Sequence, residues 1–116
     1  MGATLKRVYE PATSADGKRI LVDRLWPRGL SKDKAKVDHW FKEVAPSPAL
    51  CQWFGHDPEK WAEFQKRYRA ELKNNPVLDE LRTLSAQGNV TLLYASRDQE
   101  HNEAMVLQKL LDDATT

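Results

Sequence analysis

The segment from Asn89 to Ala95 most constrains the fold, because its pattern predicts a strand that is buried on both faces. Val90, Leu92, Leu93 and Tyr94 form a largely apolar run of strand length. Continuous runs of this kind are typical of central strands in parallel sheets, whereas half-exposed strands alternate between apolar and polar residues. Such a strand needs other elements packed against both of its faces, so the sequence predicts a layered α/β fold.

Amphipathic helices flank this strand along the chain. A short helix is predicted to begin at Ser47 and to end near Gly55, and two longer ones begin at Asp57 and Asn75, each start being followed by a proline that fits the first helical turn. A last helix is predicted from Asp98. The inward stripes of the three longer helices are expected to be Trp61, Phe64, Tyr68 and Leu72; Leu78, Leu81 and Leu84; and Ala104, Leu107 and Leu111.

Two further strands are predicted over Thr4–Tyr9 and Arg19–Asp23. Their short connection favours a hairpin, although a compact crossover between non-adjacent strands is also compatible with it. The segment Val37–Val44 fits either a helix or a strand, and its Trp, Phe and Val content favours the strand slightly. Together these elements predict a single layered domain over residues 1–116, with a small parallel or mixed sheet of three to four strands packed by helices.

Composition limits where such a chain can work. The single cysteine, Cys51, cannot form an internal disulfide, and its apolar neighbours indicate an unreactive thiol packed in the core. No apolar stretch approaches the ~20 residues that cross a bilayer, and no apolar run follows Met1 as in a leader peptide. We therefore expect a cytoplasmic protein without membrane contact.

Polar residues follow two of the predicted strands at their carboxyl ends. Asp23, Arg24 and Arg28 come at the end of the second strand, and Ser96 and Arg97 follow the last one. If these strands are parallel neighbours, the two groups share one rim of the sheet, where open α/β sheets bind ligands. Arginines beside a helix start suit a phosphate or carboxylate, so the sequence predicts a site for a small anionic ligand.

Other interpretations of the same residues stay open. The arginines and Asp23 can equally form an ion-paired connection that ties a loop to the sheet, and Ser96 or Asp98 can simply cap the last helix. If the site catalyses a reaction, Asp23 or His101 would be the general base. His101 is predicted in the first turn of the last helix, where an exposed and inert side chain is the simpler expectation.

The histidines do not indicate a metal site. The three, His39, His56 and His101, are widely separated, and Asp57 beside His56 is expected to cap a helix. We predict neither a metal nor a cofactor.

A basic segment suggests a rival function. The protein has a net charge of +1, yet residues 18–36 contain seven Lys or Arg against two Asp, which gives this segment +5. With the nearby Trp26 and Trp40, the segment is also compatible with a regulatory, nucleic-acid-associated or protein-interaction module, although no helix-turn-helix pattern supports DNA binding. Packing is the expected role of Trp26, and the oligomeric state is left open.

Four motifs together resemble one family. They are Val22–Gly29 (VDRLWPRG), Ala45–Pro48 (APSP), Trp53–Pro58 (WFGHDP) and Leu92–Asp98 (LLYASRD). These blocks are similar to those of the YeaO-like proteins within the DUF488 family of unknown function, and the resemblance covers nearly the whole chain. It implies a family but no reaction.

The resemblance also implies a difference from larger family members. Those proteins place a cysteine after the last strand and a Cys-His-Arg run near the helix that follows. Here Ala95 and the stretch Glu100-His101-Asn102 occupy the comparable positions. Cysteine chemistry is therefore not expected of this chain.

Overall fold

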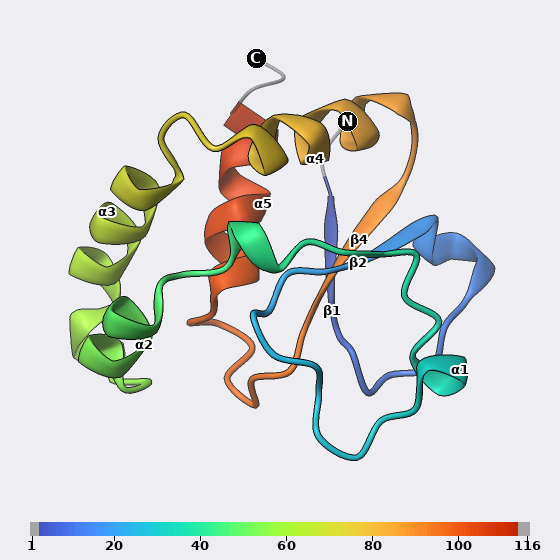
Figure 1. Cartoon of the computed structure of the whole chain (residues 1–116), viewed down its shortest axis with the longest axis horizontal. Helices are drawn as coiled ribbons and strands as arrows, with labels where there is room; N and C mark the ends of the chain where they lie inside the picture. The colour runs from blue at the N-terminus through green and yellow to red at the C-terminus, as the bar shows by residue number, and fades with distance from the viewer. Residues whose placement is uncertain (1–2, 114–116) are drawn as a thin grey trace.

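The sheet is parallel throughout and has its last strand near the centre. The computed structural model describes residues 3–113, and its four strands lie in the order β1-β4-β2-β3 (Figure 1). All five residues of β4 are buried, as the apolar run predicts. The α/β class and the parallel sheet are thereby confirmed. The strand bounds are Thr4–Arg7 for β1, Lys18–Leu21 for β2, His39–Trp40 for β3 and Val90–Tyr94 for β4.

The connection between β1 and β2 is a crossover, so the favoured hairpin is wrong. Both strands run parallel to β4, which lies between them and pairs Leu5 with Leu92 on one side and Ile20 with Leu92 on the other. The connection contains a 3₁₀ turn, η1 (Ser14–Asp16), and it reaches the start of β4, where the Lys18 amide donates to the Asn89 carbonyl. Burial of the apolar β4 between the two strands outweighs the short-range preference for a hairpin.

Local capping signals position the helices. The Ser47 side chain accepts the Leu50 amide, Asp57 accepts the Glu59 amide, and Asn75 accepts two amides at the start of α4. All three predicted starts are confirmed, although a 3₁₀ turn, η3 (Pro58–Lys60), precedes the long helix. The helices are α1 (Lys32–Ala35), α2 (Pro48–Phe54), α3 (Trp61–Leu72), α4 (Pro76–Gln87) and α5 (Glu103–Asp113).

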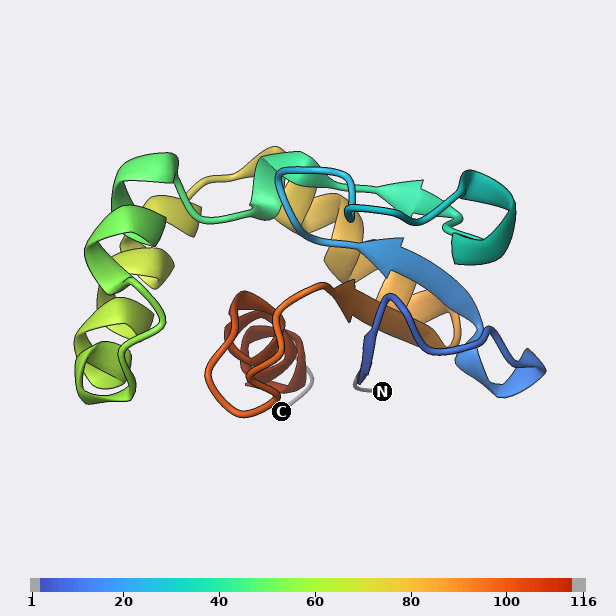
Figure 2. The same ribbon diagram turned by 90° about the horizontal axis from the view of Figure 1, so that it is seen from below.

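The main core lies on one face of the sheet. Figure 2 shows α2, α3 and α5 on one side of the sheet and α1 on the other. Ile20 and Leu92 face the larger cluster, which also takes in residues of α4, whereas Leu21 and Leu93 face a smaller cluster with Val8 and Ala35. The second face is therefore covered mainly by connecting segments.

The apolar stripe predicted for the long helix is mostly buried, and the segment predicted as a strand over Val37–Val44 forms one only in part. Phe64, Tyr68 and Leu72 are buried in the core, and Trp61 packs against it while remaining partly exposed. Val37–Val44 forms a strand only over β3, because a 3₁₀ turn, η2 (Lys42–Val44), follows directly.

The last helix begins later than predicted. Asp98 accepts the amides of Glu100 and His101 through Oδ1, which closes a turn of its own rather than the first turn of α5. Asn102 caps α5 instead, and its Oδ1 accepts the Met105 amide at 3.1 Å. His101 therefore precedes the helix. The sequence had suggested a position in its first turn.

A buried charge network ties the crossover to the sheet. The side chain of Asp16 is 8% exposed. Its carboxylate accepts hydrogen bonds from Arg19 Nη1 at 2.7 Å and from Lys6 Nζ at 3.1 Å. Arg19, only 3% exposed, also donates to the carbonyl oxygens of Ala35 and Lys36. Burial alone would raise the pKa of Asp16, but hydrogen bonds from Thr13, Arg19 and Lys6 hold it well below its usual range.

Among residues 3–113, no helix is long and apolar enough to cross a membrane.

Candidate functional site

The ends of β2 and β4 bring the predicted polar residues to one edge. The two strands are parallel neighbours that pair Leu21 with Leu93, so the segments that follow them leave the sheet on the same side. We call this edge the rim, meaning residues 23–28 and 95–98. Two groups that are some seventy residues apart in sequence thus lie at one edge of the fold.

The rim encloses a cavity with two adjoining hollows. The cavity has a volume of about 510 Å³ and is lined by Asp23, Arg24, Arg28, Cys51, His56 and Glu103 among others. A hollow of about 320 Å³ lies beside it against His56, Ser96, Arg97 and Asp98. A smaller one, of about 90 Å³, extends toward Phe64 and His101. His56 lines all three spaces, which together form the candidate site.

Two carboxyl groups meet at the cavity. Asp23 Oδ2 accepts the Ala95 amide at 2.8 Å, which links the end of β2 to the end of β4. The pKa of Glu103, in the first turn of α5, is raised well above its usual range by burial and then by a hydrogen bond with Asp23 and the charge of that residue. Two carboxyl groups in such contact favour one shared proton, because both cannot ionise cheaply.

Sequence reasoning missed Glu103. An acidic residue in the first turn of a helix ordinarily faces solvent and stabilises the helix dipole. Nothing near it in the sequence indicates that it reaches Asp23, which lies on another element.

Arg24, which lines the cavity, is held by neutral acceptors and not by carboxylates. Arg24 donates to the carbonyl oxygens of Ala45 at 3.2 Å and Pro46 at 3.3 Å. Within residues 3–113, no carboxylate forms an ion pair with Arg24, Arg28 or Arg97. The ion-paired connection that the sequence left open is therefore absent from this part of the chain.

The residues after β4 form a braced turn. Ser96 Oγ accepts the Asp98 amide at 3.1 Å, so Ser96 and Asp98 cap this turn rather than the helix. Arg7, at the end of β1, donates to the carbonyl oxygens of Ala95 and Ser96 at 3.0 Å each. The side chain of Arg97 has no such contact with residues 3–113 and lines the 320 Å³ hollow.

His101 is less exposed than the sequence suggested. It is partly buried, its Nδ1 lies 3.0 Å from Asp98 Oδ2, and its ring meets Trp61 edge-on at 5.3 Å. Hydrogen bonds from the Glu100 amide and from His101 lower the pKa of Asp98. The carboxylate therefore holds the imidazole against Trp61.

Cys51 does not pack in the core, so that prediction is wrong. The residue belongs to the short helix α2, is exposed and lines the cavity. The pKa of its thiol is raised by the protein around the sulfur and then by the charge of Glu103, so the thiolate is disfavoured. Within the described chain, no group of three or more His, Cys, Asp or Glu residues is placed to hold a metal ion.

Six of the seven cations of the basic segment are exposed, and one, Arg19, is buried. Arg19 is buried in the Asp16 network, whereas Arg24 is exposed and donates to the carbonyls of the Ala45-Pro46 segment. Trp26 packs against the smaller core cluster, and Trp40 donates its indole hydrogen to the Asp23 carbonyl at 2.7 Å. The charges that remain exposed are mainly lysines.

The comparisons with known proteins agree with the motifs. A family model described as the inactive DUF488-N3 subclade, DUF488-N3i, matches residues 3–116. The chain belongs to this family. Proteins similar to this chain match it over nearly their whole length.

Two of these relatives span most of the chain. Rv3073c of Mycobacterium tuberculosis is 45% identical over 106 residues, which cover 91% of this chain and 90% of that protein. YeaO of Escherichia coli is 41% identical over 108 residues, covering 92% of this chain and 94% of that protein. The resemblance to the YeaO-like proteins is thus confirmed. No solved structure matches the DUF488-N3i chain.

Proposed function

We propose that this DUF488-N3i protein binds a small organic anion, such as a phosphorylated or carboxylated metabolite, in the rim cavity. One observation supports the proposal above the others. Three arginines, Arg24, Arg28 and Arg97, line the cavity and its neighbouring hollow without an ion pair to any carboxylate of residues 3–113. Arginines that line one space without a direct ion pair favour an anion between them.

Asp23 and Glu103 make the cavity less negative than two ionised carboxylates would. If Asp23 and Glu103 share a proton, the pair holds one negative charge instead of two. The proton and the remaining oxygen atoms can then form hydrogen bonds with hydroxyl groups of a ligand whose charged group lies near Arg28 and Arg97. This division favours a ligand with an anionic end and a polar, uncharged end.

Binding is better supported than catalysis. The two candidate bases are engaged elsewhere, since Asp23 accepts the Ala95 amide and His101 pairs with Asp98. The raised pKa of Cys51 disfavours a thiolate nucleophile. The family model is itself described as an inactive subclade, which agrees with a binding role.

Nucleic-acid binding by the basic segment has weaker support. One of its seven cations, Arg19, is buried, and the exposed Arg24 already donates to protein carbonyl oxygen atoms. Trp40 keeps 38% of its surface exposed, but its indole hydrogen is already donated. This rival would be favoured over a small-molecule site if the protein bound nucleic acids of any sequence and the affinity fell steeply as the salt concentration rose.

A thermal-shift screen tests the proposal. The protein would be heated with each member of a panel of sugar phosphates, glycerol 3-phosphate, phosphoserine and dicarboxylates at fixed ionic strength. A ligand that binds only the folded state raises the melting temperature by mass action. We expect at least one saturable shift, which the double variant Arg28→Gln and Arg97→Gln abolishes.

The control is Lys66→Gln, which removes one exposed positive charge from α3. If the panel produces no saturable shift, or if the shift survives the arginine substitutions as it survives Lys66→Gln, the rim proposal is wrong.

A further inference from the structure

A second hollow lies away from the rim, between the ends of three helices. It has a volume of about 270 Å³ and is lined by residues of α3, α4, α5 and the link between α3 and α4. The last turns of α3 and α5 meet there, at the end of the molecule where β4 begins (Figure 1). We call it the helix-end hollow, meaning the space bounded by Arg69, Leu72, Lys73, Leu78, Arg82 and Leu110.

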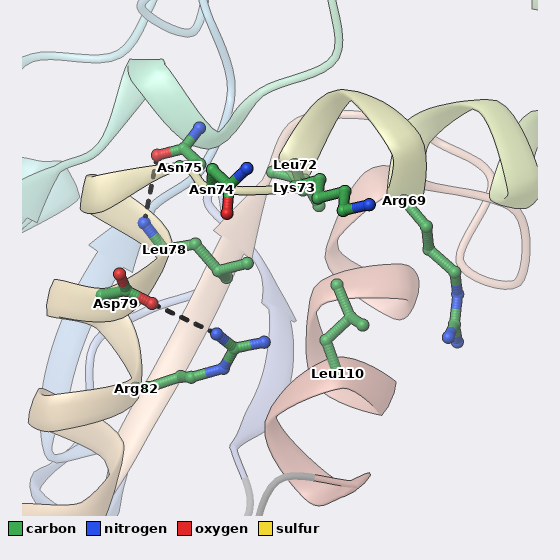
Figure 3. Close-up of a pocket in the computed structure, with 9 residues that line it drawn as sticks. All are labelled: Arg69, Leu72, Lys73, Asn74, Asn75, Leu78, Asp79, Arg82 and Leu110. Atoms are coloured by element: carbon green, nitrogen blue, oxygen red, sulfur yellow. Dashed lines mark hydrogen bonds and ion pairs between the residues drawn. The ribbon is translucent and has the colours of Figure 1, made fainter.

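Three cations border this space against a single carboxylate. Arg69 and Lys73 come from the end of α3, and Arg82 comes from the middle of α4. Figure 3 shows Lys73 directed toward Arg69, and Arg82 reaching across from α4 toward Leu110. The carboxylate is Asp79, whose Oδ1 accepts Arg82 Nη1 at 3.2 Å.

The pairing with Asp79 leaves most of the positive charge unmatched. Its side chain is 72% exposed, so the ion pair is weakened by solvent. Within residues 3–113, neither Arg69 nor Lys73 pairs with a carboxylate. Arg67 on the same helix is different, because it pairs with Glu63 at 3.0 Å and lies over the Trp53 ring.

Arg82 has a donor without an acceptor. Its Nε atom is buried and has no hydrogen-bond partner among the described residues, although its outer nitrogen atoms are more accessible. An unsatisfied buried donor is unfavourable and commonly marks the position of a water molecule or an ion. The guanidinium is thus positioned at the hollow with part of its hydrogen-bonding capacity unused.

The dipole of α3 accounts for only part of this arrangement. Cations in the last turn of a helix stabilise its negative end, which suffices for Arg69 and Lys73. It does not account for Arg82, which lies in the middle of its helix. The start of α4 is not the anion-binding element either, because the Asn75 side chain already accepts the Val77 and Leu78 amides.

We infer that the helix-end hollow binds a small anion with two or more charged groups, of the diphosphate or tricarboxylate class. Three cations on two helices match such a ligand better than they match a single charge. The side chains of Leu72, Leu78 and Leu110 exclude water from one side of the space, which strengthens the ionic contacts. The volume is at the small end of ligand pockets, so a compact metabolite fits and a nucleotide does not.

An NMR titration with pyrophosphate and citrate tests the inference. Amide signals of ¹⁵N-labelled protein would be followed at constant ionic strength, with chloride replaced by the probe anion. We expect saturable shifts of the amides of Asn74 and Asn75, including their side-chain NH₂ groups. Shifts at Ser96 and Arg97 would report the rim separately.

The variants distinguish ligand binding from a dipole role. Because a charge-assisted hydrogen bond contributes ~1.5–3 kcal/mol, Arg69→Gln with Lys73→Gln should raise the Kd at least about tenfold, and Arg82→Gln alone should do the same. Lys66→Gln, on the exposed side of α3, should leave the Kd unchanged. The inference is overturned if wild-type shifts do not saturate, or if the variants lose thermal stability but bind both probes as the wild type does.

Discussion

Asp16→Asn should destabilise the protein severely, because it removes the buried negative charge that pairs with Lys6 and Arg19. The carboxylate accepts two cations, Lys6 and Arg19, and also the amide and hydroxyl of Thr13. Asparagine keeps the shape of the side chain but turns an NH₂ group toward one of its former donors. Arg19 would then be a buried guanidinium without a counter-charge.

The magnitude follows from that burial. Removing one partner of a buried ion pair costs ~3–5 kcal/mol, whereas an exposed pair contributes about 0–1 kcal/mol. A domain of this length has a total stability of roughly 6–17 kcal/mol, so the substitution would remove a large share of it. Glu63→Gln is the matched control, since it breaks an ion pair with Arg67 in which both side chains are 48% exposed.

Urea unfolding followed by tryptophan fluorescence measures the effect. The midpoint should fall strongly for Asp16→Asn and little for Glu63→Gln, with the slope unchanged in both. The pH dependence adds a second test, because the pKa of Asp16 is depressed in the folded state. Its stabilisation is present above the unfolded pKa of 3.8 and is lost as the pH falls toward the folded pKa. Asp16→Asn should lack that acid loss. A loss below about 1 kcal/mol at neutral pH, equal to that of the control, would refute the reasoning.

Three other substitutions or modifications test separate parts of the structure. Gly17→Ala should lower the free energy of unfolding, measured in urea, by more than about 1–3 kcal/mol, because φ is +65° and an added Cβ would lie 2.2 Å from a backbone carbonyl oxygen. Gly88→Ala is the control and should change the free energy of unfolding little, since the space around Gly88 is open. Glu103→Gln should stabilise the protein above the unfolded pKa of glutamate, because the raised folded pKa means that the wild type loses stability as the pH rises through that range. A flatter stability profile from pH 4.5 upward would confirm this, and an unchanged profile would show that the contact with Asp23 does not perturb Glu103. Cys51 should react with iodoacetamide more slowly than a free thiol at neutral pH despite its exposure, since its pKa is raised, and mass spectrometry showing faster alkylation would contradict that expectation.

Signals that act within a few residues were predictable from the sequence. Ser47, Asp57 and Asn75 each cap a helix because their side chains reach amides only two or three positions away. The start of α5 was misplaced because Asp98 and Asn102 are both good capping residues, and tertiary packing decides between them.

Features that depend on distant partners were not predictable. The direction of β2 relative to β1 is decided by a strand some seventy residues later, and no local pattern indicates which strand lies between them. Glu103 has its altered pKa only because the fold brings Asp23 to it. The shared rim was inferred correctly as a meeting of strand ends, because both strands are apolar enough to be neighbours in the interior.

The position of β4 has a consequence for synthesis on the ribosome. Residues of β1 and β2 leave the ribosome early, yet each pairs with β4, whose residues are numbered 90–94. At ~5–20 residues per second, the nascent chain waits several seconds with both strand edges unpaired. Helices α2 to α4 can form during that time from local contacts, but the sheet cannot. Nascent chains that stop before β4 should therefore be targets for chaperones, and folding should be completed only when the last quarter of the protein has been made.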